Sequence, residues 1–254
     1  MSLLAVEDLC LRFGGLDALS AVTLEVPERA LFAVIGPNGA GKTSFFNCLT
    51  GYYRPTGGSV RFDGREISRL SVDEVAALGV RRTFQNVRLF ARLTAHENVL
   101  AGAHLRASAS LWGTLFGTPR MRRHERALSD EAHHWLGYVG LADKATVLAA
   151  DLPYGMRKRL EVARALIARP RVLLLDEPAA GVSSVERDEL AAVIRRTWDS
   201  GVTVVMIEHD VELVMQLAST VAVLDRGLLL TQGSPGEVRN DPRVIEAYLG
   251  RRHR

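Results

Sequence analysis

Short apolar runs alternate with amphipathic runs along much of the chain. Four of the apolar runs have the length of strands, and three of them are almost continuously apolar, which is typical of strands buried on both faces of a sheet. They are ALFAVIG (30–36), RVLLLD (171–176), VTVVMIE (202–208) and STVAVLD (219–225). Helical patterns follow the first three runs, at 42–50, about 185–199 and 210–217. This alternation predicts an α/β fold with a mostly parallel sheet.

The beginning of the chain predicts a second, smaller sheet. Segments 3–13, 18–26 and 59–64 are typical of shorter antiparallel strands, and the sequences PERA and RPTGGS supply turns. These segments therefore form an expected antiparallel β subdomain attached to the parallel sheet.

The middle of the chain is helical in character. From about 87 to 152 no strong strand pattern occurs, and Thr94 with Glu97 three residues later matches the capping box that begins a helix. The run SASLWGTLFGTPRM (108–121) has no clear assignment. We therefore expect a single domain over 1–254 with three parts. They are an α/β core with the antiparallel β subdomain (1–86 and 157–225), a helical insert (87–156), and a C-terminal hairpin with short helices and a tail (226–254).

Composition narrows the class of protein. Hydrophobic residues make up 47% of the 254 residues and charged residues 24%, as expected for a globular protein with a sizeable core. The net charge of +3 is too small to argue for nucleic acid as a partner, and we interpret the arginine clusters as solvated faces. Cys10 and Cys48 both lie in apolar runs, which favours buried free thiols in a reducing compartment. Because neither a signal peptide nor a run of about 18 apolar residues occurs, we expect a cytosolic soluble domain.

The sequence GPNGAGKTS follows the first apolar strand and opens a helix, and it satisfies the pattern G-x-x-x-x-G-K-[ST]. Glycines let backbone N–H groups approach phosphate oxygens, and the following helix presents its positive end. Lys42 is expected to reach the β- and γ-phosphates, and the Thr43 hydroxyl to bind Mg²⁺. The predicted phosphate-binding residues are Gly36, Pro37, Asn38, Gly39, Ala40, Gly41, Lys42, Thr43 and Ser44.

Acidic residues at the end of a buried strand complete the predicted phosphate site. In VLLLDEP, Asp176 is placed to hold Mg²⁺, directly or through water, and Glu177 to orient or deprotonate an attacking water. His209 ends the next strand in MIEHD, where we expect it to contact the γ-phosphate or the attacking water. A GTPase is disfavoured because no Asn is followed by Lys, as guanine recognition by N-K-x-D requires. A small-molecule kinase remains open on these residues alone.

These sequences together resemble the ATP-binding subunits of ABC transporters across nearly the whole chain. The resemblance rests on the order of GPNGAGKTS, RTFQN, a helical insert, DLPYGMRKRLEVARAL, RVLLLDEP and MIEHD. The RTFQN form and the ending VIEAYLG are similar to one subfamily, which powers importers of branched-chain or other hydrophobic amino acids, with relatives for urea and short amides. The resemblance implies the P-loop ABC ATPase fold, ATPase activity, and ATP and Mg²⁺ as ligands.

The resemblance implies roles for individual residues. Phe13 falls where the family stacks an aromatic ring on adenine, and Gln85 where a glutamine links Mg²⁺ and the attacking water to the transmembrane partner. Glu177 is the expected catalytic base and His209 the switch histidine, with Lys42 on the phosphates. The expected Mg²⁺ ligands are Thr43, Gln85 and Asp176.

The signature loop departs from the family, in which it is usually L-S-G-G-Q or, in this subfamily, L-S-Y-G-Q. Its residues here are Leu152, Pro153, Tyr154, Gly155 and Met156. Gly155 keeps the N–H donor for a γ-phosphate on the opposite subunit, whereas Pro153 has neither hydroxyl nor N–H. One hydrogen bond to a charged group is worth about 1.5–3 kcal/mol. Since proline suits the first turn of a helix, we expect the fold to survive. Ser183 replaces the aspartate of the family's S-A-L-D loop.

The resemblance also implies partners and a location. Two such domains dimerise head to tail, so we expect a second ATP-binding subunit, of different sequence, together with transmembrane permease subunits and, indirectly, a solute-binding protein. The chain is then held at the cytoplasmic side of the inner membrane by the permease.

The leading hypothesis is an ATPase that drives uptake, with one competent ATP site and one weak site. An alternative is a nucleotide-dependent structural subunit with weak hydrolysis, which the intact Glu177 disfavours and the altered signature favours. A non-transport ABC ATPase is less favoured, because such proteins usually have two cassettes in one chain. The positions of Gln85 and His209 disfavour a small-molecule kinase.

Overall fold

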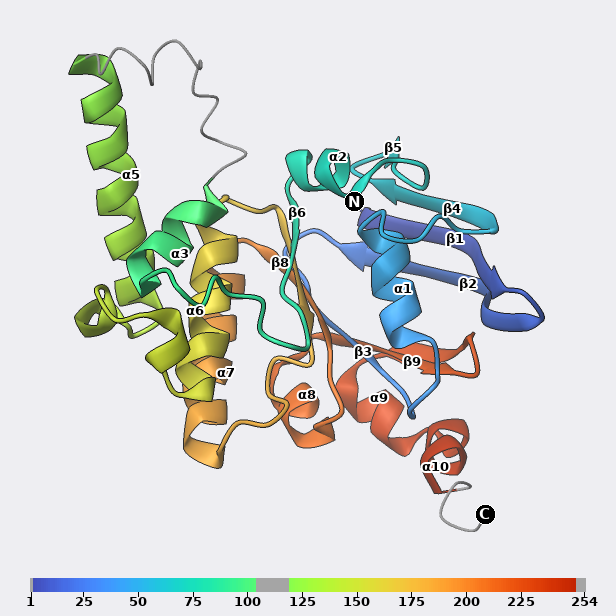
Figure 1. Cartoon of the computed structure of the whole chain (residues 1–254). Coiled ribbons are helices and arrows are strands. Elements are labelled where there is room, and N and C mark those ends of the chain that lie inside the picture. Colours follow the sequence, from blue (N-terminus) through green and yellow to red (C-terminus); the bar gives the residue numbers. More distant parts are fainter. Residues whose placement is uncertain (1, 104–118, 250–254) are drawn as a thin grey trace. The chain divides into compact units, whose positions relative to one another are not determined.

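The computed structural model describes residues 2–103 and 119–249. Its backbone contacts divide the chain into two compact units. Unit 1 comprises Met1–Arg82, Arg171–Ala180 and Ile194–Arg254, and unit 2 comprises Thr83–Pro170 and Gly181–Val193. Figure 1 shows the elements of both units, coloured along the sequence.

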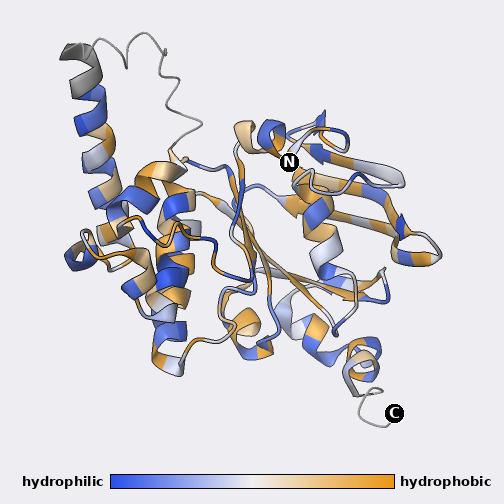
Figure 2. Cartoon of the chain, in the orientation of Figure 1, coloured by the Kyte–Doolittle hydropathy of each residue, from blue (hydrophilic) through white to orange (hydrophobic). Residues whose placement is uncertain are grey.

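Unit 1 contains the predicted parallel sheet, in the order β10-β9-β3-β8-β7-β6. Its strands are β3 (Leu31–Ile35), β6 (Val80–Arg82), β7 (Val172–Asp176), β8 (Thr203–Ile207), β9 (Thr220–Asp225) and β10 (Leu228–Gly233). Neighbouring strands are parallel except β10, which pairs antiparallel with β9. Every residue of β3, β7 and β8 is buried, and the strands of this sheet are mostly hydrophobic in Figure 2. The predicted α/β fold with a mostly parallel sheet is thereby confirmed.

The predicted antiparallel sheet is also present in unit 1, in the order β2-β1-β4-β5. Its strands are β1 (Ser2–Phe13), β2 (Leu16–Pro27), β4 (Gly57–Phe62) and β5 (Arg65–Glu66). Helix α1 (Lys42–Leu49) lies between the two sheets (Figure 1), and Phe45 and Phe46 are fully buried in a core cluster with residues of both. Burial of these aromatic rings fixes the helix that begins at the phosphate-binding sequence.

Short helices complete unit 1. Strand β10 pairs antiparallel with β9, and two of the short helices follow β10. Helix α2 and strands β5 and β6 have too few residues to give an apolar periodicity, and the sequence did not predict them. The short helices are α2 (Val72–Ala77), α8 (Val211–Leu217), α9 (Pro235–Asn240) and α10 (Pro242–Leu249). The tail 250–254 lies outside the described residues.

Unit 2 is helical, as predicted for the middle of the chain. The capping box at Thr94 and Glu97 is formed, with the Glu97 carboxylate 2.7 Å from the Thr94 nitrogen. The unassigned segment 108–121 lies mostly outside the described residues. The elements of unit 2 are α3 (Ala95–Gly102), α5 (Pro119–Tyr138), η1 (Ala142–Lys144), η2 (Ala149–Asp151), α6 (Tyr154–Leu166) and the first part of α7 (Ser184–Asp199).

The two cysteines are free thiols, as expected. Cys48 is buried in α1, and burial raises its pKa to about 12. Cys10 is only partly buried, which corrects the expectation that both are buried, because the strand β1 lies in a sheet with one solvated face.

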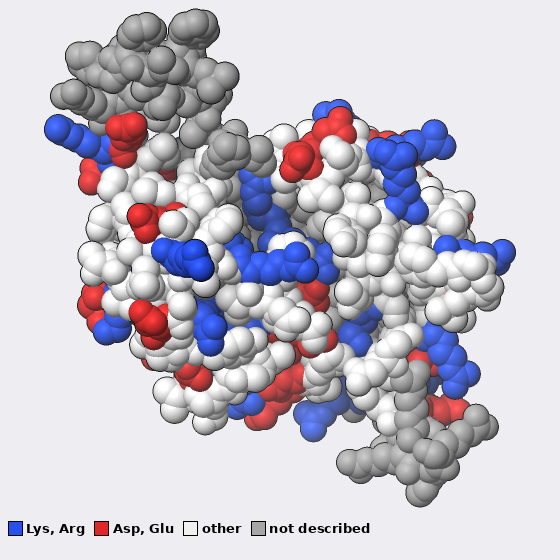
Figure 3. All heavy atoms as spheres, viewed as in Figure 1, with Lys and Arg blue, Asp and Glu red and all other residues white. Residues whose placement is uncertain are grey.

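Exposed arginines frequently pair with carboxylates in unit 1. Arg12 lies 2.5 Å from Asp17, and Arg171 lies 2.5 Å from Asp63. On the face drawn in Figure 3, groups of both signs occur among uncharged surface. None of the helices within the described residues is both long and apolar enough to cross a membrane.

Two glycines with the same backbone conformation give a test of the antiparallel sheet. Gly58 (φ 75°) and Gly64 (φ 76°) both have left-handed backbones, but a Cβ at Gly58 would lie 2.2 Å from the Asp8 carbonyl oxygen, whereas nothing lies within 4 Å at Gly64. Gly64→Ala incurs only the conformational penalty, about 1 kcal/mol of unfolding free energy. Gly58→Ala also separates β1 from β4, so we expect a loss of more than about 3 kcal/mol by urea denaturation. Equal losses in the two variants would contradict this packing.

Candidate functional site

The phosphate-binding sequence forms a tight loop between β3 and α1. Gly41 precedes α1 with φ 100°, a left-handed conformation that favours glycine. A Cβ at Gly36 would lie 2.1 Å from the Leu224 carbonyl oxygen, so no larger residue fits there without moving β9. The glycines therefore let this loop pass close to neighbouring backbone. The N terminus of α1 points toward the loop.

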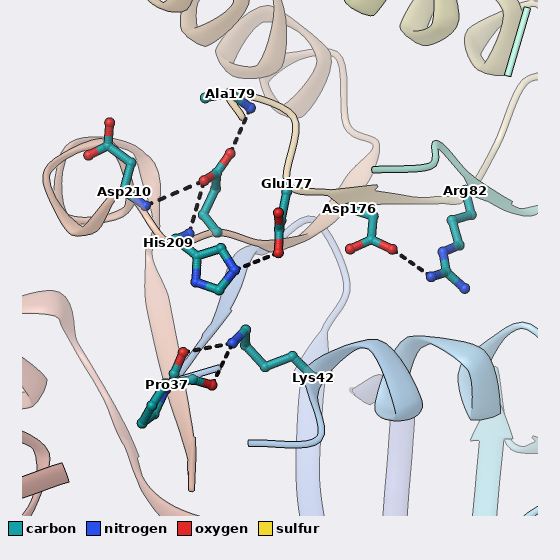
Figure 4. Close-up of polar contacts among 10 residues, drawn as sticks. Pro37, Lys42, Arg82, Asp176, Glu177, Ala179, His209 and Asp210 are labelled. Atoms are coloured by element: carbon teal, nitrogen blue, oxygen red, sulfur yellow. Dashed lines mark hydrogen bonds and ion pairs between the residues drawn. The ribbon is translucent and has the colours of Figure 1, made fainter. Parts of the chain in front are cut away.

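Lys42, the first residue of α1, is buried within the loop. Its ammonium group donates to the Gly36 carbonyl oxygen at 2.7 Å and to the Pro37 carbonyl oxygen at 3.0 Å (Figure 4). These contacts hold a positive charge inside the loop. A phosphate bound in the loop would offer this ammonium group a stronger, charged acceptor.

Asp176 ends β7 and is paired with Arg82, which ends the neighbouring strand β6. The guanidinium lies 2.6 Å from a carboxylate oxygen of Asp176, and the side chains of Asp176 and Arg82 are only 4% and 8% exposed. Arg82 also donates to the Asn47 side chain on α1 at 2.6 Å and lies over the Phe46 ring. The pair gives Asp176 a charged partner in a buried place and ties β6, β7 and α1 together.

Glu177 follows Asp176 and contacts His209, as Figure 4 shows. The histidine Nε2 lies 2.5 Å from a Glu177 carboxylate oxygen. Glu177 has φ 47°, an unusual conformation for a large side chain, and its N–H donates to the Ile207 carbonyl at 2.9 Å. Strained backbone of this kind concentrates at functional sites, where the surrounding structure holds it in place.

Glu208, one residue before His209, was not predicted as a site residue. It is buried, and its carboxylate accepts backbone N–H groups from Ala179 at 2.7 Å and from His209 at 3.0 Å. Burial raises the pKa of Glu208, and these donors act in the opposite direction. The carboxylate thus joins the loops that follow β7 and β8, which carry Glu177 and His209. A glutamate at the end of the apolar run VTVVMIE (202–208) was the available sequence signal.

The predicted residues are divided between the two units. Unit 1 contains the phosphate loop, Asp176, Glu177, His209 and also Phe13, which is 44% exposed and lies edge-on to Tyr53 with ring centroids 5.2 Å apart. Unit 2 contains the exposed Gln85, whose backbone carbonyl accepts from Lys158 at 2.7 Å, and the whole of 152–156.

The segment 152–156 begins helix α6. Leu152 and Gly155 are buried, whereas Pro153 is exposed and Tyr154 and Met156 are intermediate. Pro153 is the N-cap residue and makes no side-chain cap hydrogen bond. Leu152 and Pro153 have extended backbones (ψ 140° and 153°), so the helix starts cleanly at Tyr154. Pro153 therefore precedes the first turn as the N-cap residue, one position before the place expected from the sequence.

The donor atoms of unit 1 suit a hard cation. Within the described residues, no group of three or more His, Cys, Asp or Glu could hold a metal ion. A cation at Asp176 would therefore take further oxygens from the Thr43 hydroxyl and from a bound phosphate. Mg²⁺ is commonly bound in this way, by one or two carboxylates together with substrate phosphates.

Comparisons with known proteins agree on one family. A family model described as ABC transporter matches residues 19–180, and one described as branched-chain amino acid ATP-binding cassette transporter matches residues 229–254. The chain is 48% identical to the high-affinity branched-chain amino acid transport ATP-binding protein BraF of Pseudomonas aeruginosa over 98% of each chain. It is 43% identical to the corresponding protein LivG of Escherichia coli, again over 98% of each chain.

Solved structures give the same result. The fold is similar to the crystal structure of the ADP conformation of an ATP-binding cassette of an ABC transporter, with a TM-score of 0.84 and 27% identity. That similarity covers 98% of this chain and 99% of the other.

The buried ion pair gives a testable difference between two aspartates. Asp176→Asn leaves the buried Arg82 guanidinium facing a neutral amide, so we expect a loss of about 3 kcal/mol of unfolding free energy. Asp143→Asn is the matched control, because Asp143 pairs with Lys144 at 2.8 Å but is 71% exposed, and we expect little change. Urea denaturation of both variants measures the difference. Similar small losses would show that the buried pair contributes no more than the exposed one.

Proposed function

The chain belongs to the ABC transporter family as one of its ATP-hydrolysing subunits, and we propose that it powers an importer of branched-chain or other hydrophobic amino acids. The observation that supports the substrate class most directly is 48% identity, over 98% of both chains, to a subunit named for branched-chain amino acid transport. The match of residues 229–254 to a branched-chain amino acid cassette model supports it independently of the nucleotide site.

Hydrolysis is assigned to the residues gathered in unit 1. Lys42 leaves its two backbone acceptors and binds the β- and γ-phosphates of ATP. Glu177 orients the attacking water and accepts its proton, and His209, which contacts the Glu177 carboxylate, holds that carboxylate in place and contacts the γ-phosphate. Thr43 and Asp176 would hold Mg²⁺, with Gln85 as a further ligand, and the ion would supply positive charge to the phosphates. Phe13, exposed beside Tyr53, stacks on adenine.

The residues of unit 2 act on other chains. The loop 152–156 contacts ATP held by a second ATP-binding subunit in a head-to-tail dimer, and Gln85 connects the site to transmembrane permease subunits. These permease subunits hold the chain at the cytoplasmic side of the membrane, and a solute-binding protein delivers the amino acid to them. A division into the α/β core, the helical insert and the C-terminal hairpin with short helices fits these separate tasks.

A second candidate is a nucleotide-dependent structural subunit that binds ATP and closes the assembly but hydrolyses little. Pro153 favours it, because this N-cap residue offers no side-chain hydrogen bond either to its own helix or to a phosphate. In the first candidate, by contrast, the site built from this chain's own Glu177 and His209 is competent, and only the site facing 152–156 is weak.

Measuring ATP hydrolysis separates the two candidates. It is measured once with this chain alone and once with this chain mixed with its partner ATP-binding subunit. We expect activity only in the mixture, and we expect Glu177→Gln to lower it by at least about 10²-fold, because the catalytic base is lost. With permease and solute-binding protein in vesicles, leucine but not urea should be taken up, again dependent on Glu177. Equal activity of the chain alone would contradict the weak site, and uptake of urea instead of leucine would contradict the substrate class.

Restoring the family's signature residues gives a second test. Pro153→Ser together with Met156→Gln returns a hydroxyl donor and a side-chain amide to the loop. Because one hydrogen bond to a charged group is worth about 1.5–3 kcal/mol, we expect turnover of the assembled transporter to rise about tenfold. Unchanged turnover in the double variant would show that the loop already closes on ATP as well as the family sequence does.

A further inference from the structure

Helix α6 begins without the usual acceptor for its first N–H groups. The side chain of an N-cap residue normally accepts a hydrogen bond from the second or third N–H of the helix. The N-cap here is Pro153, which has no polar side-chain atom, and Gly155 is the second residue of the helix. The N–H of Gly155 is thus a donor that the helix itself does not satisfy.

Glu186, from the beginning of α7, places its carboxylate against Gly155. The Gly155 N–H contributes to lowering the pKa of that carboxylate. The approach is so close that a Cβ at Gly155 would lie 2.4 Å from both the carboxylate carbon and the oxygen Oε1 of Glu186. Both residues belong to unit 2. A negatively charged group from the same chain therefore occupies the helix N terminus that the proposed function assigns to a phosphate.

The second carboxylate oxygen of Glu186 has a different task. Oε2 accepts from the Ser183 N–H at 3.0 Å and from the Ser183 hydroxyl at 2.8 Å, which forms a capping box at the start of α7. These donors lower the pKa of Glu186 and keep it ionised at neutral pH, with a smaller contribution from Gly155. One carboxylate thus joins the signature loop to the loop that follows Asp176 and Glu177.

Other capping boxes in the chain show which part of this arrangement is unusual. Ser234 and Glu237 form the same box at the start of α9, with distances of 2.7 Å from the Glu237 oxygen to the Ser234 nitrogen and hydroxyl. The hydrogen bonds that lower the pKa of Glu237 come from Ser234 alone. Capping therefore explains the contact of Glu186 with Ser183, but it does not explain the contact with Gly155.

We propose that Glu186 is a positioning residue of the signature loop, whose carboxylate holds the Gly155 N–H and has to leave it before a γ-phosphate can take its place. This inference rests on the proposed role of 152–156 in contacting ATP of the second subunit. A carboxylate and a phosphate cannot share one N–H at hydrogen-bond distance, because their charges repel at close range. Glu186 therefore weakens nucleotide-dependent closure at the site that faces this loop.

The test measures association, with hydrolysis suppressed. The full-length chain carrying Glu177→Gln is mixed with the second ATP-binding subunit, and the ATP concentration for half-maximal association is determined by analytical ultracentrifugation. Glu186→Gln is added to this background, because glutamine removes the charge but keeps an oxygen acceptor and suits the third position of a helix. Glu237→Gln is the matched control, since it makes the same change in a capping box remote from 152–156 in sequence.

We expect Glu186→Gln to lower the ATP concentration for half-maximal association about five- to tenfold relative to Glu237→Gln, with similar thermal midpoints for the two variants. A purely structural role predicts unchanged or weaker association, because glutamine is the poorer acceptor. Glu186→Ala, which also removes the charge, should shift association in the same direction.

Each other outcome has a definite meaning. If the parent associates with ATP but neither Glu186 variant does so more tightly than the control, the inference about Glu186 is wrong and the proposed function stands. If the parent does not associate at any ATP concentration, the proposed role of 152–156 is wrong, and the inference is overturned with it.

Discussion

The site depends on the parallel pairing of three fully buried strands, β3, β8 and β7. Parallel neighbours end at the same edge of a sheet, so the residues after each strand converge there although they are far apart in the sequence. The phosphate loop follows β3, Asp176 ends β7, and His209 comes shortly after β8. The apolar runs that drive burial of the sheet therefore also determine which polar groups meet.

Bringing charges to a buried edge requires partners for each of them. Three different solutions occur within unit 1. Asp176 pairs with Arg82, Lys42 donates to two backbone carbonyls of its own loop, and Glu208 accepts backbone N–H groups. The last two arrangements use the backbone of loops, so the positions of loops and charges are determined together. This explains why the edge can hold the acidic side chains of both Asp176 and Glu208, because each has its own partner.

The sequence predicted the parts of this arrangement that depend on local pattern. The apolar runs located β3 and β7–β9, and the phosphate-loop motif located α1. It did not predict β6, because three residues give no periodicity, and Arg82 was missed with it. The pairing of Arg82 with Asp176 arises from neighbouring strands separated by 94 positions, which single-sequence patterns do not report. Glu186 was missed for the same reason, because no sequence motif links it to Gly155, which lies in a different helix.

The altered loop 152–156 shows how a substitution can be structurally mild and still chemically important. Proline starts α6 without distortion, because the N–H it lacks would have no partner inside the helix. Because proline has no polar side-chain atom, it cannot accept a hydrogen bond from the Gly155 N–H. The Glu186 carboxylate from α7 lies beside Gly155 instead. A neutral serine hydroxyl at the N-cap could satisfy the same N–H without adding a negative charge. The helix start is thus preserved, and a charged carboxylate lies beside it.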